Sequence, residues 1–260
     1  MRKNVRTLRH PFAHDLHLVS LPGTNARTIV CLHGYGANFR IIEMVKATKL
    51  VDATLVGFNF PDHDLLERPC DPEKLSFGTM EELLPALYVL KHCVVDECRT
   101  AIDTYGFSAG GAALINILGV LNTKTYDEQL KEIGISEKEK ATILLAIQKG
   151  IVLLDAPLKS VEEIMEKREP NPELEAIAHQ YRRNHFCPLD SIKRLHGLSL
   201  NILLYFEEPD EIVGNRDDAV LVELLKNANK QGSTTVITGS SGGHATIHWK
   251  LWQQYAQRCT

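Results

Sequence analysis

Short apolar segments rich in β-branched residues alternate along this chain with longer segments whose apolar residues recur at helical spacing. A short apolar run predicts a strand buried on both faces, whereas apolar residues three and four positions apart predict a helix with one buried side. Strands that alternate with helices build a mostly parallel sheet flanked by helices. The predicted strands cover residues 28–32, 53–60, 100–105, 151–154, 201–206 and 234–238.

Near the amino terminus the pattern differs. Residues 14–21 alternate weakly between apolar and polar side chains, and a turn signal follows over residues 21–25. We therefore expect an antiparallel strand that joins the sheet through a hairpin. The predicted helices cover residues 79–98, 220–226 and 247–256, and a further one begins at Gly110.

The chain length fits one α/β domain, predicted to span residues 1–260. Two segments, at about 122–150 and 158–198, interrupt the alternation of strands and helices. We expect both to be helical insertions on the sheet. The capping-box patterns that mark helix starts within them are Ser136 with Glu139 and Ser160 with Glu163.

Composition narrows the classes of partner. The net charge of -4, from 33 acidic and 29 basic residues, argues against a nucleic-acid surface. Six cysteines scattered along the chain favour reduced thiols in a cytoplasmic protein. No run of about 18 apolar residues occurs, so no membrane span is expected. The basic segment before Pro11 lacks the apolar core of a secretory signal.

The segment Gly106-Phe-Ser-Ala-Gly110 matches the pattern G-x-S-x-G between a predicted strand and a predicted helix. In that context the pattern predicts a sharp turn that lifts the serine hydroxyl above the edge of the sheet. Glycine is needed two residues before and two after the serine because larger side chains would crowd the turn. Ser108 is therefore the candidate nucleophile, and an ordinary structural turn is the alternative.

A serine hydroxyl needs a histidine base, and that histidine needs an orienting carboxylate. After a turn of this kind the acid and the histidine are expected later in the chain, in that order, each just after a strand. Asp210 follows the strand over 201–206, and His244 follows the strand over 234–238 through a glycine-rich loop. These two residues are the candidate acid and base.

Each assignment has a rival. Asp155 directly follows the preceding strand and could replace Asp210 as the acid. His248 lies one helical turn after His244, and the two could together bind a metal, although no acidic general base accompanies them. Glu207 and Glu208 lie closer than Asp210 to the end of the strand over 201–206. We expect their side chains to point away from His244.

Two backbone N–H groups are expected to bind the negative oxygen of a tetrahedral intermediate. The first is that of Ala109, which follows the serine in the turn. The second should come from the loop after Leu32, with the sequence His33-Gly-Tyr-Gly36, and Tyr35 is the first choice.

Together these segments resemble the α/β-hydrolase superfamily over roughly residues 28–256. Leu32-His-Gly-Tyr-Gly36 and Gly106-Phe-Ser-Ala-Gly-Gly-Ala112 are most similar to its carboxylesterase and acyl-protein-thioesterase group. The resemblance implies an α/β-hydrolase fold and a serine hydrolase activity. Two positions depart from that group's pattern: Ala109 replaces the usual glutamine, and Glu207 replaces a glycine that usually lies three residues before the acid.

The predicted reaction is hydrolysis of a carboxylic ester or thioester of a small acyl substrate, through an acyl-serine intermediate, with neither metal nor organic cofactor. A peptidase or a hydrolase of carbon–carbon bonds would use the same triad, because fold and triad do not determine the bond that is cleaved. A non-catalytic binding protein on a hydrolase scaffold is a further alternative. Acyl chain length, leaving group and oligomeric state stay open.

The segment 158–198 is expected to cap the site, with a contribution from 122–150. The strand before it should end at the same sheet edge as Ser108, and a connection of about forty residues is more often a functional lid than a plain loop. The segment is heavily charged, whereas a lid that opens onto lipid would expose a broad apolar face. We therefore expect soluble, short-to-medium acyl substrates, and a solvated decoration away from the site is the alternative.

Overall fold

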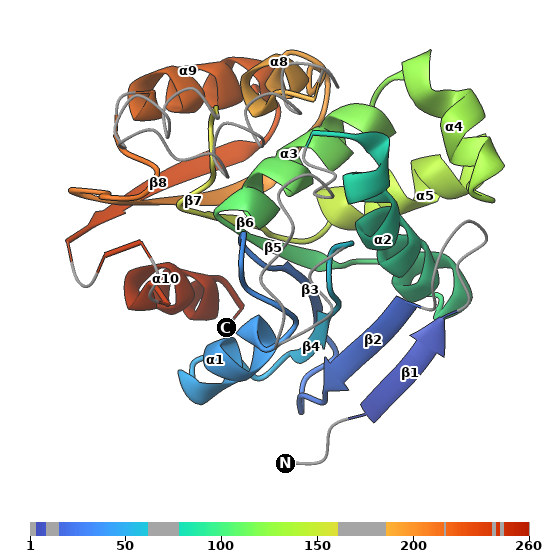
Figure 1. The fold of residues 1–260 in the computed structure, drawn as a ribbon, viewed down its shortest axis with the longest axis horizontal. Coiled ribbons are helices and arrows are strands. Elements are labelled where there is room, and N and C mark those ends of the chain that lie inside the picture. Colours follow the sequence, from blue (N-terminus) through green and yellow to red (C-terminus); the bar gives the residue numbers. More distant parts are fainter. Residues whose placement is uncertain are drawn as a thin grey trace.

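The structure is a computed structural model, and it describes residues 4–8, 16–61, 78–160, 186–215, 217–240, 243–244 and 247–259. Its strands are β1 (Asn4–Leu8), β2 (Leu16–Leu21), β3 (Thr28–Leu32), β4 (Thr54–Gly57), β5 (Asp103–Phe107), β6 (Val152–Asp155), β7 (Asn201–Glu207) and β8 (Ser233–Gly239). They form one eight-stranded sheet in the order β1-β2-β4-β3-β5-β6-β7-β8 (Figure 1). From β4 to β8 in this order all neighbours are parallel, whereas β1 and β2 pair antiparallel at one edge.

The helices are α1 (Ile41–Ala47), α2 (Met80–Lys91), α3 (Ala109–Leu121), α4 (Asp127–Glu132), α5 (Glu137–Gln148), α8 (Pro188–Ile192), α9 (Asp218–Ala228) and α10 (Trp249–Cys259). A π-helical turn, η2 (His92–Asp96), continues α2, and a 3₁₀ turn, η3 (Lys124–Tyr126), precedes α4. In the described part of the chain, none of these helices is both long and apolar enough to cross a membrane.

The core has two layers because alternate residues of each strand face opposite sides of the sheet. In β3, Val30 and Leu32 pack into one core cluster, whereas Ile29 and Cys31 pack into the other. Apolar residues of α2, α3, α5, α8 and α9 close the first cluster, and those of α1 and α10 close the second. Figure 1 shows these two groups of helices on opposite sides of the sheet. The predicted mostly parallel sheet flanked by helices is confirmed.

The predicted hairpin over residues 21–25 is wrong. β2 is antiparallel as expected, but it pairs with β1 and β4 and not with the next strand in sequence, β3. The backbone N–H groups of Thr24 and Asn25 donate to the Asp52 carbonyl at 2.9 and 3.3 Å, so the turn packs against the loop before β4. β4 therefore lies between β2 and β3. β1 was not predicted, since its side chains are almost all exposed and leave no buried alternation.

The two predicted insertions are described unequally. The first contains η3, α4 and α5, and the Ser136–Glu139 capping box at the start of α5 is present as predicted. The apolar side of α5 joins the same core cluster as α2 and α3. Residues 161–185 of the second insertion, including Glu163 of its predicted capping box, lie outside the described residues.

The register aligns the carboxyl ends of the parallel strands along one side of the sheet, perpendicular to the outer strands' edges, and this side is called the carboxyl edge. Gly106 pairs with Leu32 on one side of β5, and Phe107 pairs with Asp155 on the other. Glu207 at the end of β7 pairs with Gly239 of β8. In sheets of this kind, sites form in the loops beyond the carboxyl ends of the strands. All the candidate residues follow strands at this edge.

Candidate active site

Ser108 lies in the sharp turn between β5 and α3, with backbone torsion angles of φ 51° and ψ -116°. Holding a residue with a side chain at positive φ costs about 1–3 kcal/mol, so neighbouring structure must maintain it. The Ser108 N–H donates to the Asp155 carbonyl at 2.9 Å, and the Leu158 N–H donates to the Ser108 carbonyl at 3.1 Å. The end of β6 and the chain that leaves it therefore hold this turn.

The two glycines of the motif are required by close backbone contacts. A Cβ at Gly106 would lie 2.6 Å from the Gly110 carbonyl oxygen, and one at Gly110 would lie 2.4 Å from the Leu32 carbonyl oxygen. Neither backbone oxygen can move without displacing a strand or the start of α3. Positions 106 and 110 must therefore be glycine for the serine loop and the start of α3 to lie this close to the sheet.

We expect Gly106→Ala to lower the free energy of unfolding by about 3 kcal/mol, because its Cβ must push the turn away from α3. Urea denaturation followed by circular dichroism measures this change. Gly197→Asn is the control, since a Cβ at Gly197 meets nothing within 4 Å and asparagine tolerates the observed φ of 86°. Equal stability of the two variants would contradict the packing argument.

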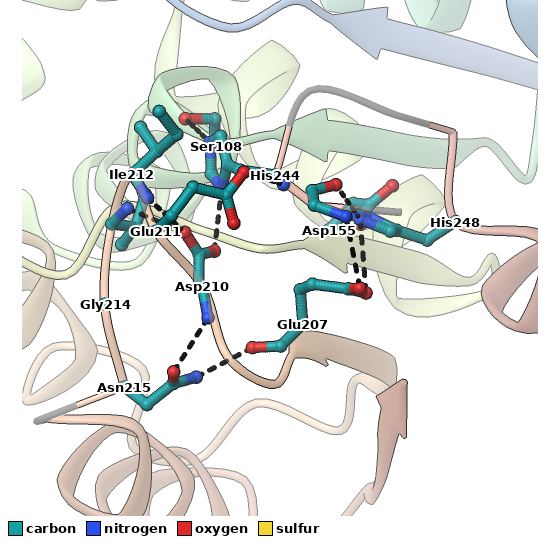
Figure 2. Close-up of polar contacts among 12 residues, drawn as sticks. Ser108, Asp155, Glu207, Asp210, Glu211, Ile212, Gly214, Asn215, His244 and His248 are labelled. Carbon is teal, nitrogen blue, oxygen red and sulfur yellow. Dashed lines mark hydrogen bonds and ion pairs between the residues drawn. The ribbon is translucent and has the colours of Figure 1, made fainter. Parts of the chain in front are cut away.

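His244 reaches Ser108 from the loop after β8, and Asp210 reaches His244 from the loop after β7 (Figure 2). His244 Nε2 lies 2.7 Å from Ser108 Oγ, and His244 Nδ1 lies 2.8 Å from Asp210 Oδ2. An ionised carboxylate only accepts hydrogen bonds, so Nδ1 carries the proton and Nε2 accepts from the serine hydroxyl. The three side chains form one continuous line of hydrogen bonds, and both Asp210 and His244 are buried.

Asp210 is held as an ionised acceptor. Its second oxygen, Oδ1, accepts from the N–H groups of Ile212 at 2.9 Å and Val213 at 2.8 Å. Burial raises the pKa of Asp210, but the hydrogen bond from His244 and the two backbone N–H groups outweigh burial, so the net pKa is lowered. The carboxylate is thus charged at neutral pH and fixes the orientation of the His244 ring.

The side chains of the two rivals contact each other and not the Ser108 hydroxyl. His248 Nδ1 contacts Asp155 Oδ1, and Asp155 Oδ2 accepts from the Tyr105 hydroxyl at 2.8 Å. Figure 2 shows this pair as a separate group beside Ser108, His244 and Asp210. The two histidine rings therefore face different partners, which does not fit the metal pair considered as an alternative. Within the described ranges, no group of three or more histidine, cysteine, aspartate or glutamate side chains could hold a metal ion.

The loop after β3 lies against the serine turn. A Cβ at Gly34 would lie 3.2 Å from Ser108 Cβ, which places this loop beside the hydroxyl. The buried His33 ring holds the loop: its Nε2 accepts from the Phe60 N–H at 3.1 Å, so Nδ1 carries the proton and donates to the Gly34 carbonyl at 2.8 Å. In a trans peptide the N–H points opposite to the carbonyl, so the Tyr35 N–H points away from His33.

Comparisons with known proteins bear on the fold. No family model matches the chain, and no curated protein shows significant similarity to it. Among solved structures, the Pyrococcus furiosus esterase Pf2001 superposes with a TM-score of 0.62 at 15% identity, covering 99% of this chain and 90% of that one. A Lactobacillus plantarum lipase/esterase gives 0.63 at 15% identity over 100% and 97% of the two chains, and TT1662 from Thermus thermophilus gives 0.64 at 14% over 99% and 96%. The chain has the α/β-hydrolase fold.

Residues that hold the two loops of this α/β-hydrolase fold were missed by the sequence analysis. Asn215 accepts from the Asp210 N–H at 2.9 Å and donates to the Glu207 carbonyl at 2.8 Å, which ties the acid loop to the end of β7. Glu211 accepts from the His244 N–H at 3.2 Å. No motif marks these residues, because their partners come from the fold and not from nearby sequence.

Proposed function

We propose that the protein is a serine hydrolase that cleaves a carboxylic ester or thioester through an acyl-serine intermediate. The observation that carries the proposal is the hydrogen-bonded line from Ser108 through His244 to Asp210, with Ser108 in a strained turn at the edge of the sheet. Nucleophile, base and orienting carboxylate in this geometry constitute the machinery of acyl transfer.

In the proposed reaction, His244 Nε2 takes the Ser108 proton as Oγ attacks the acyl carbon. The oxygen of the resulting tetrahedral intermediate carries the negative charge, and the backbone N–H groups of Tyr35 and Ala109 bind it. Ala109 opens α3, so its N–H has no carbonyl in a preceding helical turn and the helix dipole favours an anion there. His244 then protonates the leaving alcohol or thiol. A water molecule, deprotonated by His244, releases the acid and restores Ser108.

The similar structures support esterase chemistry, since two of them are described as an esterase and a lipase/esterase. A peptidase also shares the fold: a puromycin-hydrolyzing peptidase of Mycobacterium tuberculosis superposes with a TM-score of 0.59 at 15% identity, although the chain spans only 38% of its length. The bond cleaved is therefore the point that an experiment has to decide.

Two assays test the proposal. A fluorophosphonate probe labels only an activated serine, so labelling separates an enzyme from a binding protein on the same scaffold. A matched set of butyryl substrates, with nitrophenol, thiol or nitroaniline as leaving group, then separates ester, thioester and amide hydrolysis. We expect labelling and cleavage of the ester or thioester. No labelling would refute the enzyme proposal, and preferential cleavage of the anilide would favour a peptidase.

We further propose that residues 158–198 cap the active site of a single domain spanning residues 1–260. The segment begins beside the nucleophile, because the Leu158 N–H bonds to the Ser108 carbonyl at 3.1 Å. Lys159, which follows, is buried and bonds to the Gly214 carbonyl at 2.7 Å and to Asp218. The segment ends through α8, whose apolar residues join the core. Both ends of the proposed cap are thus fixed to the sheet and its helices.

Replacing residues 162–183 with a short Gly/Ser linker should change the ratio of kcat/KM between acetyl and octanoyl esters by about tenfold, because the cap would form part of the acyl pocket. Steady-state rates on soluble nitrophenyl esters measure the ratio. Fluorophosphonate labelling of the shortened protein shows that Ser108 is still activated. An unchanged ratio with intact labelling would identify the segment as a decoration away from the site.

A further inference from the structure

A second histidine, His248, is enclosed in a polar cluster behind the active site. His248, Asp155 and Glu207 are all at most 2% exposed. The His248 ring stacks on the Tyr205 ring, with centroids 4.2 Å apart and an angle of 21° between the planes. Figure 2 shows Asp155 and Glu207 on the two sides of this imidazole. The cluster is formed by the ends of β6 and β7 and the residue before α10.

Both nitrogens of the His248 ring face groups that accept hydrogen bonds. Nδ1 contacts the carboxylate of Asp155. Nε2 lies 3.4 Å from the Gly243 carbonyl oxygen and 3.7 Å from the nearer carboxylate oxygen of Glu207. A neutral imidazole has only one N–H and would turn a lone pair toward one of these acceptors, whereas the imidazolium donates from both nitrogens. The geometry therefore favours a charged His248.

His244, four residues earlier, has the opposite arrangement. Its Nδ1 faces a carboxylate, but its Nε2 faces the Ser108 hydroxyl, which can donate. A neutral ring satisfies both contacts, as a general base requires. The same residue type thus serves as a neutral base at position 244 and as a cation at position 248.

The charged cluster contacts both the N–H and the carbonyl of Gly243, the residue before His244. The Gly243 N–H donates to Glu207 Oε1 at 3.3 Å, and the Gly243 carbonyl faces His248 Nε2. The Tyr205 hydroxyl donates to the other oxygen of Glu207 and fixes that carboxylate. Glu207 is also one of the two positions at which this sequence departs from the pattern that it resembles. The pattern has a glycine at this position, whereas in this chain the Glu207 side chain anchors the loop that carries His244.

We propose that His248 is a positioning residue, which uses Asp155 and Glu207 to hold Gly243 and thereby keeps the His244 ring aligned between Ser108 and Asp210. This inference rests on the proposed serine hydrolase function. A misalignment of about 1 Å in such a constellation can cost about 100-fold in rate, so a contact outside the line of hydrogen bonds can matter to the reaction.

The positioning should depend on pH. Burial lowers the pKa of His248, but the bond to Asp155 and the nearby Gly243 carbonyl and Glu207 outweigh burial, so the net pKa is raised above its ordinary value of 6.5. The contribution of the cation is complete below that ordinary value and is lost as the pH rises through the raised pKa. Rising pH should therefore loosen the histidine loop.

Other titratable groups surround the His248 ring. Asp155 of β6 and Tyr205 and Glu207 of β7 contact it directly. Tyr105 lies beyond Asp155, and His244 lies on the other side of Phe107.

Two substitutions separate the two donors of the ring. In His248→Asn the amide can replace the Nδ1 donor to Asp155 but cannot reach Gly243. In His248→Gln the longer side chain can extend a donor toward Gly243 and Glu207. Tyr255→Phe is the control, because it removes a 2.7 Å hydrogen bond to the buried carboxylate of Asp103 from the same helix that His248 precedes. Asp103 is the first residue of β5, whereas Gly243 follows the carboxyl end of β8.

We measure the rate of fluorophosphonate labelling, kcat and KM on a soluble ester, and the thermal midpoint. His248→Asn should lower kcat and the labelling rate by about 10- to 100-fold with little change in KM, and His248→Gln should recover part of the loss. The wild-type kcat should decline at alkaline pH, and both variants should lack this decline. Tyr255→Phe should lower only the thermal midpoint.

The outcomes distinguish the inference from the function on which it rests. If the wild-type protein neither labels nor turns over, the hydrolase proposal fails, and this inference fails with it. If the wild-type protein reacts but His248→Asn reacts at the same rate, or changes only its thermal midpoint as Tyr255→Phe does, the positioning role alone is refuted. Equal losses in the asparagine and glutamine variants, with an unchanged alkaline limb, would refute it as well.

Discussion

Ser108→Ala should abolish esterase turnover, lowering kcat by a factor of about 10⁶, to the level of the uncatalysed background. The hydroxyl oxygen forms the bond to the acyl carbon in the proposed mechanism, and alanine offers no replacement. The fold should be retained, because the alanine side chain is smaller than serine and the backbone contacts of the turn to Asp155 and Leu158 do not involve the side chain. Turnover of a nitrophenyl ester and fluorophosphonate labelling measure the two consequences.

His244→Ala is the companion variant, and it should also lose nearly all activity, since His244 is the only base in the described part of the chain that contacts the Ser108 hydroxyl, at 2.7 Å. A Ser108→Ala protein that folds normally and keeps more than about 1% of the wild-type rate would show that another nucleophile acts. Circular dichroism and the thermal midpoint establish that both variants are folded.

Asp210→Asn should lower kcat by about 10⁴-fold, the second largest effect that we expect. The amide N–H would face the Nδ1–H of His244, so the ring would favour the other tautomer, with its proton on Nε2. That tautomer cannot accept the Ser108 proton. The pKa of Asp210 is lowered, so its ionised carboxylate, which orients the His244 ring, is lost only as the pH falls through this lowered pKa.

Asp155→Asn is the matched control for this prediction, because it makes the same change in the rival acid. Asp155 contacts His248 and Tyr105 and not His244, so its substitution should lower kcat by no more than about 100-fold, through the position of the histidine loop. Steady-state kinetics of the two variants on one ester decide the ranking. The reverse ranking would make Asp155 the acid and would contradict the triad assignment.

The sequence by itself determined the parallel strands of the sheet and the candidate residues of the active site. Buried strands such as β3 and β6 leave short runs of mostly apolar residues in the sequence. The tight turn at Ser108 requires Gly106 and Gly110, because backbone oxygens occupy the space that a side chain would need. Burial of a strand and the geometry of a tight turn each constrain residues that are adjacent in the sequence, so both can be predicted from short segments. These local signals predict Ser108, Asp210 and His244 as the candidate triad without any knowledge of their contacts.

Only the tertiary structure decided which partners meet. Two acids and two histidines follow strands at the same edge of the sheet, and no local pattern pairs Asp210 with His244 or Asp155 with His248. The pairing depends on the order of strands and on the length of each loop beyond them, which are properties of the whole sheet. The same holds for β2, whose neighbour is β4, and for Glu207, whose carboxylate anchors Gly243. Contacts between segments far apart in sequence form only when the sheet brings their ends together.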